Sequence, residues 1–229
     1  MTTKSVTSLQ ATRAVVFDAY GTLFNTHSIS AQCEEFFPGH GNKLALLWRR
    51  KQLEYSWLTS LMGKYRDFAV LTREALAFAC EQMALPLDGG RADALMFSYE
   101  KLHLFPEVRD ALAKLSHLKL AILSNGSPVM LAMLVRHSHL RFDHVLSADE
   151  VGVFKPHPRV YQLATERLGV APEAVAFVSA NGWDAAGARA FGFRVYWVNR
   201  AEQPRERLDA PPHVILKDLS ELPALLGVK

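Results

Sequence analysis

Asp18 is the residue whose position in this chain most clearly predicts chemistry. It follows a short apolar run at residues 14–17 and precedes a turn-forming segment at residues 19–22. An apolar run of this kind is typical of a strand buried on both faces, and open α/β sheets bind ligands at the carboxyl ends of such strands. Asp18 is therefore a candidate nucleophile, although an aspartate that only begins a loop would show the same local pattern.

Three further polar clusters follow predicted strands or the turns after them. The first begins at Ser124, the second is Lys155-Pro156, and the third occupies residues 179–184. Parallel sheets collect their functional side chains at this position, so we expect the clusters to meet Asp18 at one edge of a sheet. A cation, hydroxyl and amide groups and a second carboxylate would then surround the nucleophile.

Together, these clusters and the segment Phe-Asp-x-x-Gly-Thr-Leu at residues 17–23 resemble the motifs of the haloacid dehalogenase superfamily. Most members of that superfamily are phosphatases, with Asp-x-Asp in the first motif and roughly Gly-Asp-x-x-x-Asp in the last. This chain lacks both additional acids, because Tyr20 stands in the first motif and Ser179-Ala180 in the last. Magnesium prefers an octahedral set of hard oxygens, so Asp18 and Asp184 beside Lys155 would make a poor metal site. We therefore expect no metal and no other cofactor.

Three longer segments, at residues 47–58, 121–128 and 179–184, resemble the (S)-2-haloacid dehalogenases in particular, and the similarity runs nearly end to end. The resemblance implies hydrolysis of short (S)-2-haloalkanoic acids to (R)-2-hydroxyalkanoic acids and halide, through an ester formed on Asp18. Two alternatives stay open at this point. One is a phosphatase of the same superfamily with atypical metal ligation, and the other is a non-catalytic binding module that keeps the fold.

The resemblance also implies a role for each catalytic residue. Lys155 would keep Asp18 ionised, Arg49 would receive the departing halide, and Asp184 would orient or deprotonate the water that hydrolyses the ester. Arg50 departs from the uncharged residue expected beside the halide-binding arginine. The other expected catalytic residues, which would surround Asp18 and the attacking water, are Thr22, Ser179 and Asn181.

The same comparison predicts a substrate-binding pocket. Ser124 and Asn125, with the backbone amides of a helix that begins at Pro128, would bind the substrate carboxylate. Thr22 and Tyr161 are expected to support Asp18 and Lys155, respectively, by hydrogen bonds. The apolar wall around the alkyl group and the halogen would comprise Tyr20, Leu53, Phe68 and Trp183.

A helical segment separates the first strand from the rest of the predicted sheet. Apolar residues recur at three- and four-residue spacing from Leu44 to Met62, a second helix follows Thr72 and ends before Pro86, and a third covers residues 91–102. An insertion of this size resembles the helical cap domain of the family. We assign residues 26–104 to the cap, and residues 1–25 and 105–229 to a Rossmann-like core domain.

After the cap, predicted helices and strands alternate. Strands are expected at 118–123, 145–146, 174–178, 194–198 and 214–216, with helices that begin at Pro106, Pro128, Pro158 and Asp184. Alternation of this kind is typical of an α/β protein in which a parallel sheet carries helices on both faces. Residues 1–12 are expected to lie outside the fold.

The composition agrees with a globular enzyme. Apolar residues make up 49% of the chain and charged residues 21%, and the net charge of +3 is too small and too dispersed for a nucleic-acid-binding stripe. No apolar run approaches the length that spans a membrane, and the N-terminus lacks a signal-peptide core, so we expect a cytoplasmic protein. Cys33 and Cys80 are interpreted as core thiols. The expected partners are 2-haloalkanoic acids and halide, with pairing into a homodimer through the cap as a further expectation.

Overall fold

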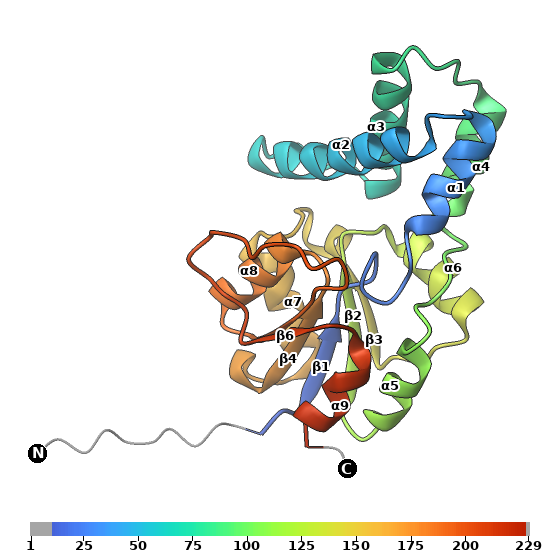
Figure 1. Ribbon diagram of the computed structural model, residues 1–229. Coiled ribbons are helices and arrows are strands. Elements are labelled where there is room, and N and C mark those ends of the chain that lie inside the picture. The colour runs from blue at the N-terminus through green and yellow to red at the C-terminus, as the bar shows by residue number, and fades with distance from the viewer. Residues whose placement is uncertain (1–10, 228–229) are drawn as a thin grey trace, which may run out of the picture.

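A parallel sheet forms the centre of the computed structural model, which describes residues 11–227 (Figure 1). Within those residues the sheet has six strands in the order β3-β2-β1-β4-β5-β6, and every neighbouring pair runs parallel. The strands are β1 (Ala14–Phe17), β2 (Lys119–Ser124), β3 (His144–Ser147), β4 (Val175–Ser179), β5 (Arg194–Val198) and β6 (Val214–Leu216).

Strand β1 lies in the middle of the sheet, and none of its four residues is exposed. The chain builds outward from β1 to β3 on one side and from β4 to β6 on the other, so the strand order reverses beside β1. A reversal of this kind opens a crevice at the carboxyl ends of the central strands. The first residue after β1 therefore faces the place where such sheets bind ligands, and that residue is Asp18.

Helices cover both faces of the sheet, as predicted (Figure 1). Helices α7 and α8 contact each other on one face, while α5 and α9 contact each other on the other face. The helices around the sheet are α5 (Val108–Lys114), α6 (Pro128–Ser138), α7 (Pro158–Leu168), α8 (Gly182–Phe191) and α9 (Leu222–Leu225). Helices α6 and α7 both begin with proline, whose fixed φ angle and missing N–H suit the first helical position.

Four further helices form a separate helical unit above the carboxyl ends of the strands (Figure 1). They are α1 (His27–Phe36), α2 (Gly41–Leu61), α3 (Phe68–Gln82) and α4 (Gly89–Ser98), and they pack on one another chiefly through α2. The unit is inserted between β1 and β2 in the chain. The fold class is therefore the predicted one, an α/β parallel sheet with a helical cap inserted after its first strand.

Two chain crossings connect the helical unit to the sheet. The outgoing chain at Phe24 pairs with the returning chain at Leu104 in an antiparallel bridge. Backbone hydrogen bonds extend this pairing, because Asn25 N–H donates to His103 O at 2.7 Å and Phe105 N–H donates to Leu23 O at 3.1 Å. The catalytic turn after β1 is thus joined directly to the chain that returns from the cap.

The structure differs from the sequence-based prediction mainly within the cap. Helix α1 was not predicted, and the helix expected after Thr72 already begins at Phe68, because the Asp67 carboxylate accepts hydrogen bonds from two backbone amides of the first turn. The third cap helix begins at Gly89 and ends at Ser98, so the prediction of a helix to residue 102 was wrong at its end.

Around the sheet the differences are smaller. The helix expected at Pro106 begins at Val108, and the helix expected at Asp184 begins at Gly182. Strands β5 and β6 have the predicted bounds. The expectation for residues 1–12 falls mostly on residues 1–10, outside the described part of the chain. None of the helices between residues 11 and 227 is long and apolar enough to cross a membrane.

Candidate active site

Asp18 lies in the crevice at the end of β1, with 6% of its surface exposed. Its amide donates to Val178 O at 2.9 Å and so continues the pairing between β1 and β4. The carboxylate oxygen Oδ2 accepts hydrogen bonds from Thr22 Oγ1 at 3.0 Å and from Asn181 Nδ2 at 2.9 Å. Thr22 supports Asp18 as predicted, and its hydroxyl in turn accepts from the amide of Ala180 at 2.8 Å.

The Lys155 ammonium lies between two carboxylates. Lys155 Nζ is 3.2 Å from Asp18 Oδ1 and 2.9 Å from Asp184 Oδ2, and the lysine is fully buried. Burial works to lower the pKa of Lys155, but the charges of Asp184 and Asp18 outweigh it and raise that pKa. The charged form of Lys155 is therefore favoured beside the candidate nucleophile.

Asp184 is the second carboxylate of this cluster and is completely buried. Its Oδ2 contacts Lys155 Nζ, and its Oδ1 accepts a hydrogen bond from Tyr161 Oη at 2.8 Å. Burial raises the pKa of Asp184, while the Lys155 charge opposes that rise. The expected hydrogen bond from Tyr161 to Lys155 was wrong in its partner, because the hydroxyl contacts Asp184 and supports the lysine only through that carboxylate.

A group of polar donors lies beside the nucleophile at the end of β2. Asn125 Oδ1 accepts from the backbone amide of Lys155 at 2.9 Å, while Asn125 Nδ2 is buried and has no hydrogen-bond partner among the described residues. Ser124 Oγ accepts from the Gly126 amide at 3.1 Å. Helix α6 begins at Pro128, immediately after this segment, so its positive N-terminal end faces the same region.

The cap contributes an arginine from α2. Arg49 Nη1 donates a hydrogen bond to Gln52 Oε1, and Gln52 Nε2 donates to Thr72 Oγ1 at 2.7 Å. Gln52 and Thr72 are both completely buried, so their hydrogen bond holds α2 in one orientation on α3. In that orientation Arg49 lines the cavity beside Asp18. Arg50 is exposed on the other side.

Gln52 is a residue of the site that the sequence-based reasoning missed. Its position three residues after Arg49 places both side chains on one face of a helix, and that spacing was the available signal. A glutamine in this pattern is equally common on the solvent-exposed face of a helix. Only the packing of α2 on α3 shows that Gln52 is buried and bonded to Arg49.

A small cavity lies between residues of the cap and residues of the sheet domain. Its free volume is about 10 Å³, close to the space that one water molecule needs. The hollow of about 570 Å³ beside residues 101–109 is far larger but is lined by no carboxylate, so size alone does not identify the site. The cavity is lined by Asp18, Tyr20, Arg49, Leu53, Phe68, Ser124, Asn125, Lys155, Asn181 and Trp183.

All ten lining residues belong to the site predicted from the sequence. The four other predicted residues lie behind the lining and contact it: Thr22 bonds Asp18, Asp184 bonds Lys155, Tyr161 bonds Asp184, and Ser179 Oγ accepts from the Asn181 amide. Tyr20 is buried against the cap tyrosine Tyr99, and burial raises its pKa far above the usual range. Its hydroxyl has no hydrogen-bond partner among the described residues.

The residues around Asp18 do not fit a divalent metal ion. The position where a phosphatase has its second acid holds Tyr20, and the space between the two carboxylates holds the Lys155 ammonium. Between residues 11 and 227 there is no group of three or more histidine, cysteine or acidic side chains that could hold a metal. A cation added between Asp18 and Asp184 would displace Lys155 and leave its charge buried without a partner.

Comparison with known proteins agrees with this fold and site. Residues 12–192 match the model of the haloacid dehalogenase-like hydrolases. The (S)-2-haloacid dehalogenase of Pseudomonas sp. strain YL is 48% identical over 204 residues, which are 87% of this chain and 88% of that protein. Haloacetate dehalogenase H-2 of Moraxella sp. strain B is 42% identical over 94% of this chain and 98% of its own length.

Solved structures give the same result. The L-2-haloacid dehalogenase of Xanthobacter autotrophicus, with chloropropionic acid covalently bound, superposes with a TM-score of 0.90 at 41% identity and covers 95% of this chain and all of its own. The fold and site thus define a hydrolase of the haloacid dehalogenase superfamily. Within that class, the chain belongs to the (S)-2-haloacid dehalogenase family.

Proposed function

We propose that this protein hydrolyses short (S)-2-haloalkanoic acids to (R)-2-hydroxyalkanoic acids and halide, through an ester on Asp18 and without a metal. The observation that carries the proposal is the Lys155 ammonium, 3.2 Å from Asp18 and 2.9 Å from Asp184. Its positive charge stabilises the ionised Asp18 carboxylate, while Tyr20 and Ser179-Ala180 occupy the motif positions where a metal-dependent phosphatase would need additional acids. The activities named for the relatives support the class of substrate.

In the first step, an oxygen of Asp18 attacks the carbon that carries the halogen. The new carbon–oxygen bond forms as the carbon–halogen bond breaks, and the halide leaves with the bonding electron pair. Arg49 lines the cavity from the cap and meets the departing negative charge. Ser124 and Asn125 hold the substrate carboxylate, with Tyr20, Leu53, Phe68 and Trp183 around the rest of the molecule. Attack opposite the halogen inverts that carbon.

In the second step, water attacks the carbonyl carbon of the Asp18 ester, and the bond between that carbon and the product oxygen breaks. Asp184 accepts a proton from the water and returns one to the leaving oxygen, while the remaining proton is released with the halide. Burial raises the pKa of Asp184, which makes it a stronger base than an exposed carboxylate. Ser179 and Asn181 hold the loop beside the ester.

Halide and phosphate assays test the proposal. We expect free halide from (S)-2-chloropropionate, with (R)-lactate as product and no loss of activity in EDTA. No phosphate should be released from p-nitrophenyl phosphate with or without Mg²⁺. Activity that EDTA abolishes and Mg²⁺ restores would support the phosphatase alternative, and the absence of both reactions would support a binding module.

The covalent intermediate needs its own test, because direct attack of water would also invert the carbon. With enzyme in excess over substrate in ¹⁸O-labelled water, the ester route gives an unlabelled first product and leaves heavy oxygen on Asp18. Mass spectrometry of the hydroxy acid and of a proteolytic fragment that contains Asp18 separates the two routes. Heavy hydroxy acid with an unlabelled fragment would recast Asp18 as a base.

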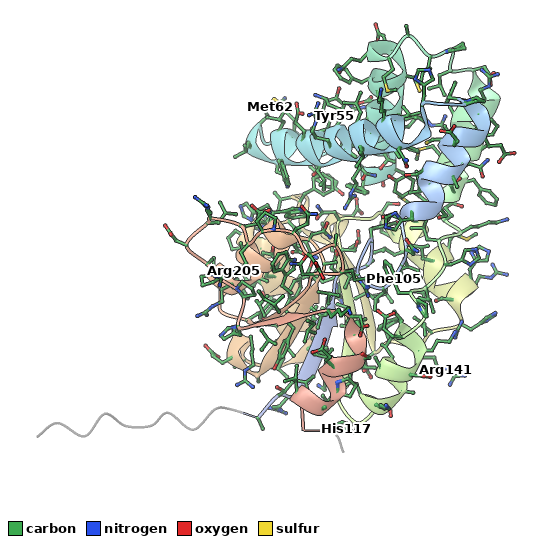
Figure 2. The ribbon with its side chains drawn as sticks, in the orientation of Figure 1. Tyr55, Met62, Phe105, His117, Arg141 and Arg205 are labelled. Atoms are coloured by element: carbon green, nitrogen blue, oxygen red, sulfur yellow. The ribbon has the colours of Figure 1, made fainter. Side chains whose placement is uncertain are left out.

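The extent of the cap, the oligomeric state and the cellular location complete the proposal. We place the cap at residues 26–104, in agreement with the bridge between Phe24 and Leu104 at its base. Dimerisation through the cap is supported by exposed apolar side chains at the end of α2, where Leu61 is 84% exposed and Met62, the residue after the helix, is 62% exposed. Figure 2 labels Met62 at this end of the cap. Light scattering with and without charged substitutions at these two positions tests pairing, and cell fractionation tests a cytoplasmic location.

A further inference from the structure

Arg200 follows β5 in the sheet and reaches back to the turn that carries the nucleophile. Its Nη1 donates to Gly21 O and its Nη2 donates to Thr22 O, both at 3.1 Å. Gly21 has a φ angle of +82°, in the left-handed region, so this part of the turn has an unusual backbone conformation. One guanidinium thus binds two consecutive carbonyl groups, which matches the planar arrangement of its donors.

The same guanidinium also contacts the chain that returns from the cap. Its Nη2 forms an ion pair with Glu107 Oε1 at 2.6 Å, and its central carbon lies 3.7 Å from the centre of the Phe105 ring. Phe105 N–H donates to Leu23 O, at the end of the catalytic turn. Figure 2 labels Phe105 at the junction between the cap and the sheet. Arg200 therefore joins the catalytic turn to this junction.

The turn has a direct effect on the nucleophile. Thr22 Oγ1 donates to Asp18 Oδ2, and the Thr22 carbonyl is one of the two that Arg200 binds. Within the turn, Gly21 N–H donates to Phe24 O and Thr22 N–H donates to Ala19 O. From outside the turn, the Ala180 amide donates to Thr22 Oγ1, but among the described residues only Arg200 donates to the Gly21 and Thr22 carbonyls. Arg200 thus adds a contact from outside the turn that opposes its displacement relative to Asp18.

We infer that Arg200 is a positioning residue, which holds the catalytic turn so that Thr22 keeps the Asp18 carboxylate aligned for attack. It touches neither the cavity lining nor the substrate and acts through Thr22. The inference concerns the same site as the proposed dehalogenation and, where it invokes catalysis, rests on that function. Its effect on the turn, however, can be measured without any substrate.

The kinetic experiment compares Arg200→Gln and Arg200→Lys with the wild type. We expect Arg200→Gln to lower kcat by roughly 10- to 100-fold, as misplacement of a reacting group does, with KM little changed because the substrate contacts remain. The Arg200→Lys enzyme should be intermediate, since an ammonium is a point charge that lacks the planar pair of donors. Arg205→Gln is the matched control: Arg205 lies on the same exposed loop (Figure 2), and its variant should retain wild-type kcat.

Amide hydrogen exchange supplies the readout that does not depend on activity. A fragment covering residues 17–24 should exchange faster in Arg200→Gln than in the wild type or Arg205→Gln, while fragments from α2 and α7 exchange alike in all three. If Arg200→Gln fails to fold, Arg200→Lys carries the same comparison. Wild-type kcat together with wild-type exchange in the folded variant would overturn the inference. Should the wild type release no halide, the proposed function fails and the exchange result still decides the role of Arg200.

Discussion

The two halves of the active site differ in how completely their polar groups are paired. On the sheet side, Asp18, Lys155 and Asp184 form a buried cluster in which every carboxylate oxygen and the ammonium have hydrogen-bond partners. In the second half, which also follows strands of the sheet, Asn125 Nδ2 and Tyr20 Oη are buried without a partner in the described residues. A paired cluster maintains a charge distribution, whereas unpaired buried donors have a free-energy cost that a ligand can remove. Under the proposed function, the first half would hold the nucleophile and the second would bind the substrate.

Removing the cation of the paired half should have the largest effect. Lys155→Met leaves Asp18 and Asp184 buried together without a counter-charge. We expect halide release to fall by about 10³-fold or more, and the free energy of unfolding to fall by about 3–5 kcal/mol, as when one partner of a buried ion pair is removed. Steady-state assays and urea unfolding measure the two quantities.

A double variant serves as the control for that experiment. Lys155→Met with Asp184→Asn removes one negative charge together with the positive one and should regain part of the stability but none of the activity. A single Lys155→Met variant with wild-type stability would show that the three groups do not form a charge cluster in solution.

Truncation of the cap arginine should affect catalysis strongly and stability little. Arg49→Ala removes the cation that faces the departing halide, and we expect a loss of about 10²- to 10³-fold in halide release. Arg50→Ala, one residue further on and exposed, is the matched control and should lose far less. The opposite ranking would mean that the face of α2 that approaches the sheet has been assigned wrongly.

Asn125 belongs to both halves, and one substitution separates its two roles. Asn125→Asp keeps the oxygen that accepts from the Lys155 amide but replaces the unpaired amide donor with an acceptor. We expect KM for 2-chloropropionate to rise by about 10- to 100-fold or more, because the lost hydrogen bond to a charged group is replaced by repulsion between two carboxylates, and the melting temperature to fall, because the new carboxylate is buried. An unaltered KM in steady-state kinetics would remove Asn125 from the carboxylate site.

The smallest effect is expected at Gln52, which acts only by orienting Arg49. Gln52→Leu keeps the buried volume and removes the hydrogen bond that holds the guanidinium. We expect halide release to fall about tenfold, again in line with one hydrogen bond to a charged group. Combined with Arg49→Ala it should add almost nothing, and additive losses in a double-mutant cycle would contradict the coupling.

Much of the site could be predicted because its residues follow strands. Asp18, Ser124 and Asn181 each lie at or just after the carboxyl end of a strand of the parallel sheet, and the sheet brings these ends together whatever the loops do. The contacts of Tyr161 and Gln52 could not be predicted in the same way. Each depends on how one helix packs against another element, and the side-chain spacing on a single helix does not specify that neighbour.

The cap shows the same limit at the level of secondary structure. Helix α1 carries only two buried residues, Ile29 and Cys33, so its apolar pattern is too sparse to predict a helix alone. The start of α3 depends on the Asp67 cap, a local signal that a stronger apolar repeat beginning later in the segment concealed. Arg200 lies outside every motif, and the role proposed for it rests on its contacts with two segments, the catalytic turn and the chain that returns from the cap.

The small size of the cavity beside Asp18 has a consequence for how the substrate reaches the site. With about 10 Å³ free, the cavity in this conformation is smaller than a haloacid, so we expect substrate binding to require movement of the cap or of the side chains that line the cavity. Two hydrogen bonds join the cap to the sheet domain in this conformation, from the Phe154 amide to Ser60 Oγ at 3.0 Å and from Tyr65 Oη to Asp149 at 2.8 Å, and opening of the cap would have to break them. The measured affinity for substrate falls with the fraction of molecules that can bind it. Stronger hydrogen bonds between cap and sheet would therefore weaken substrate binding, while they would exclude more water from the reacting groups.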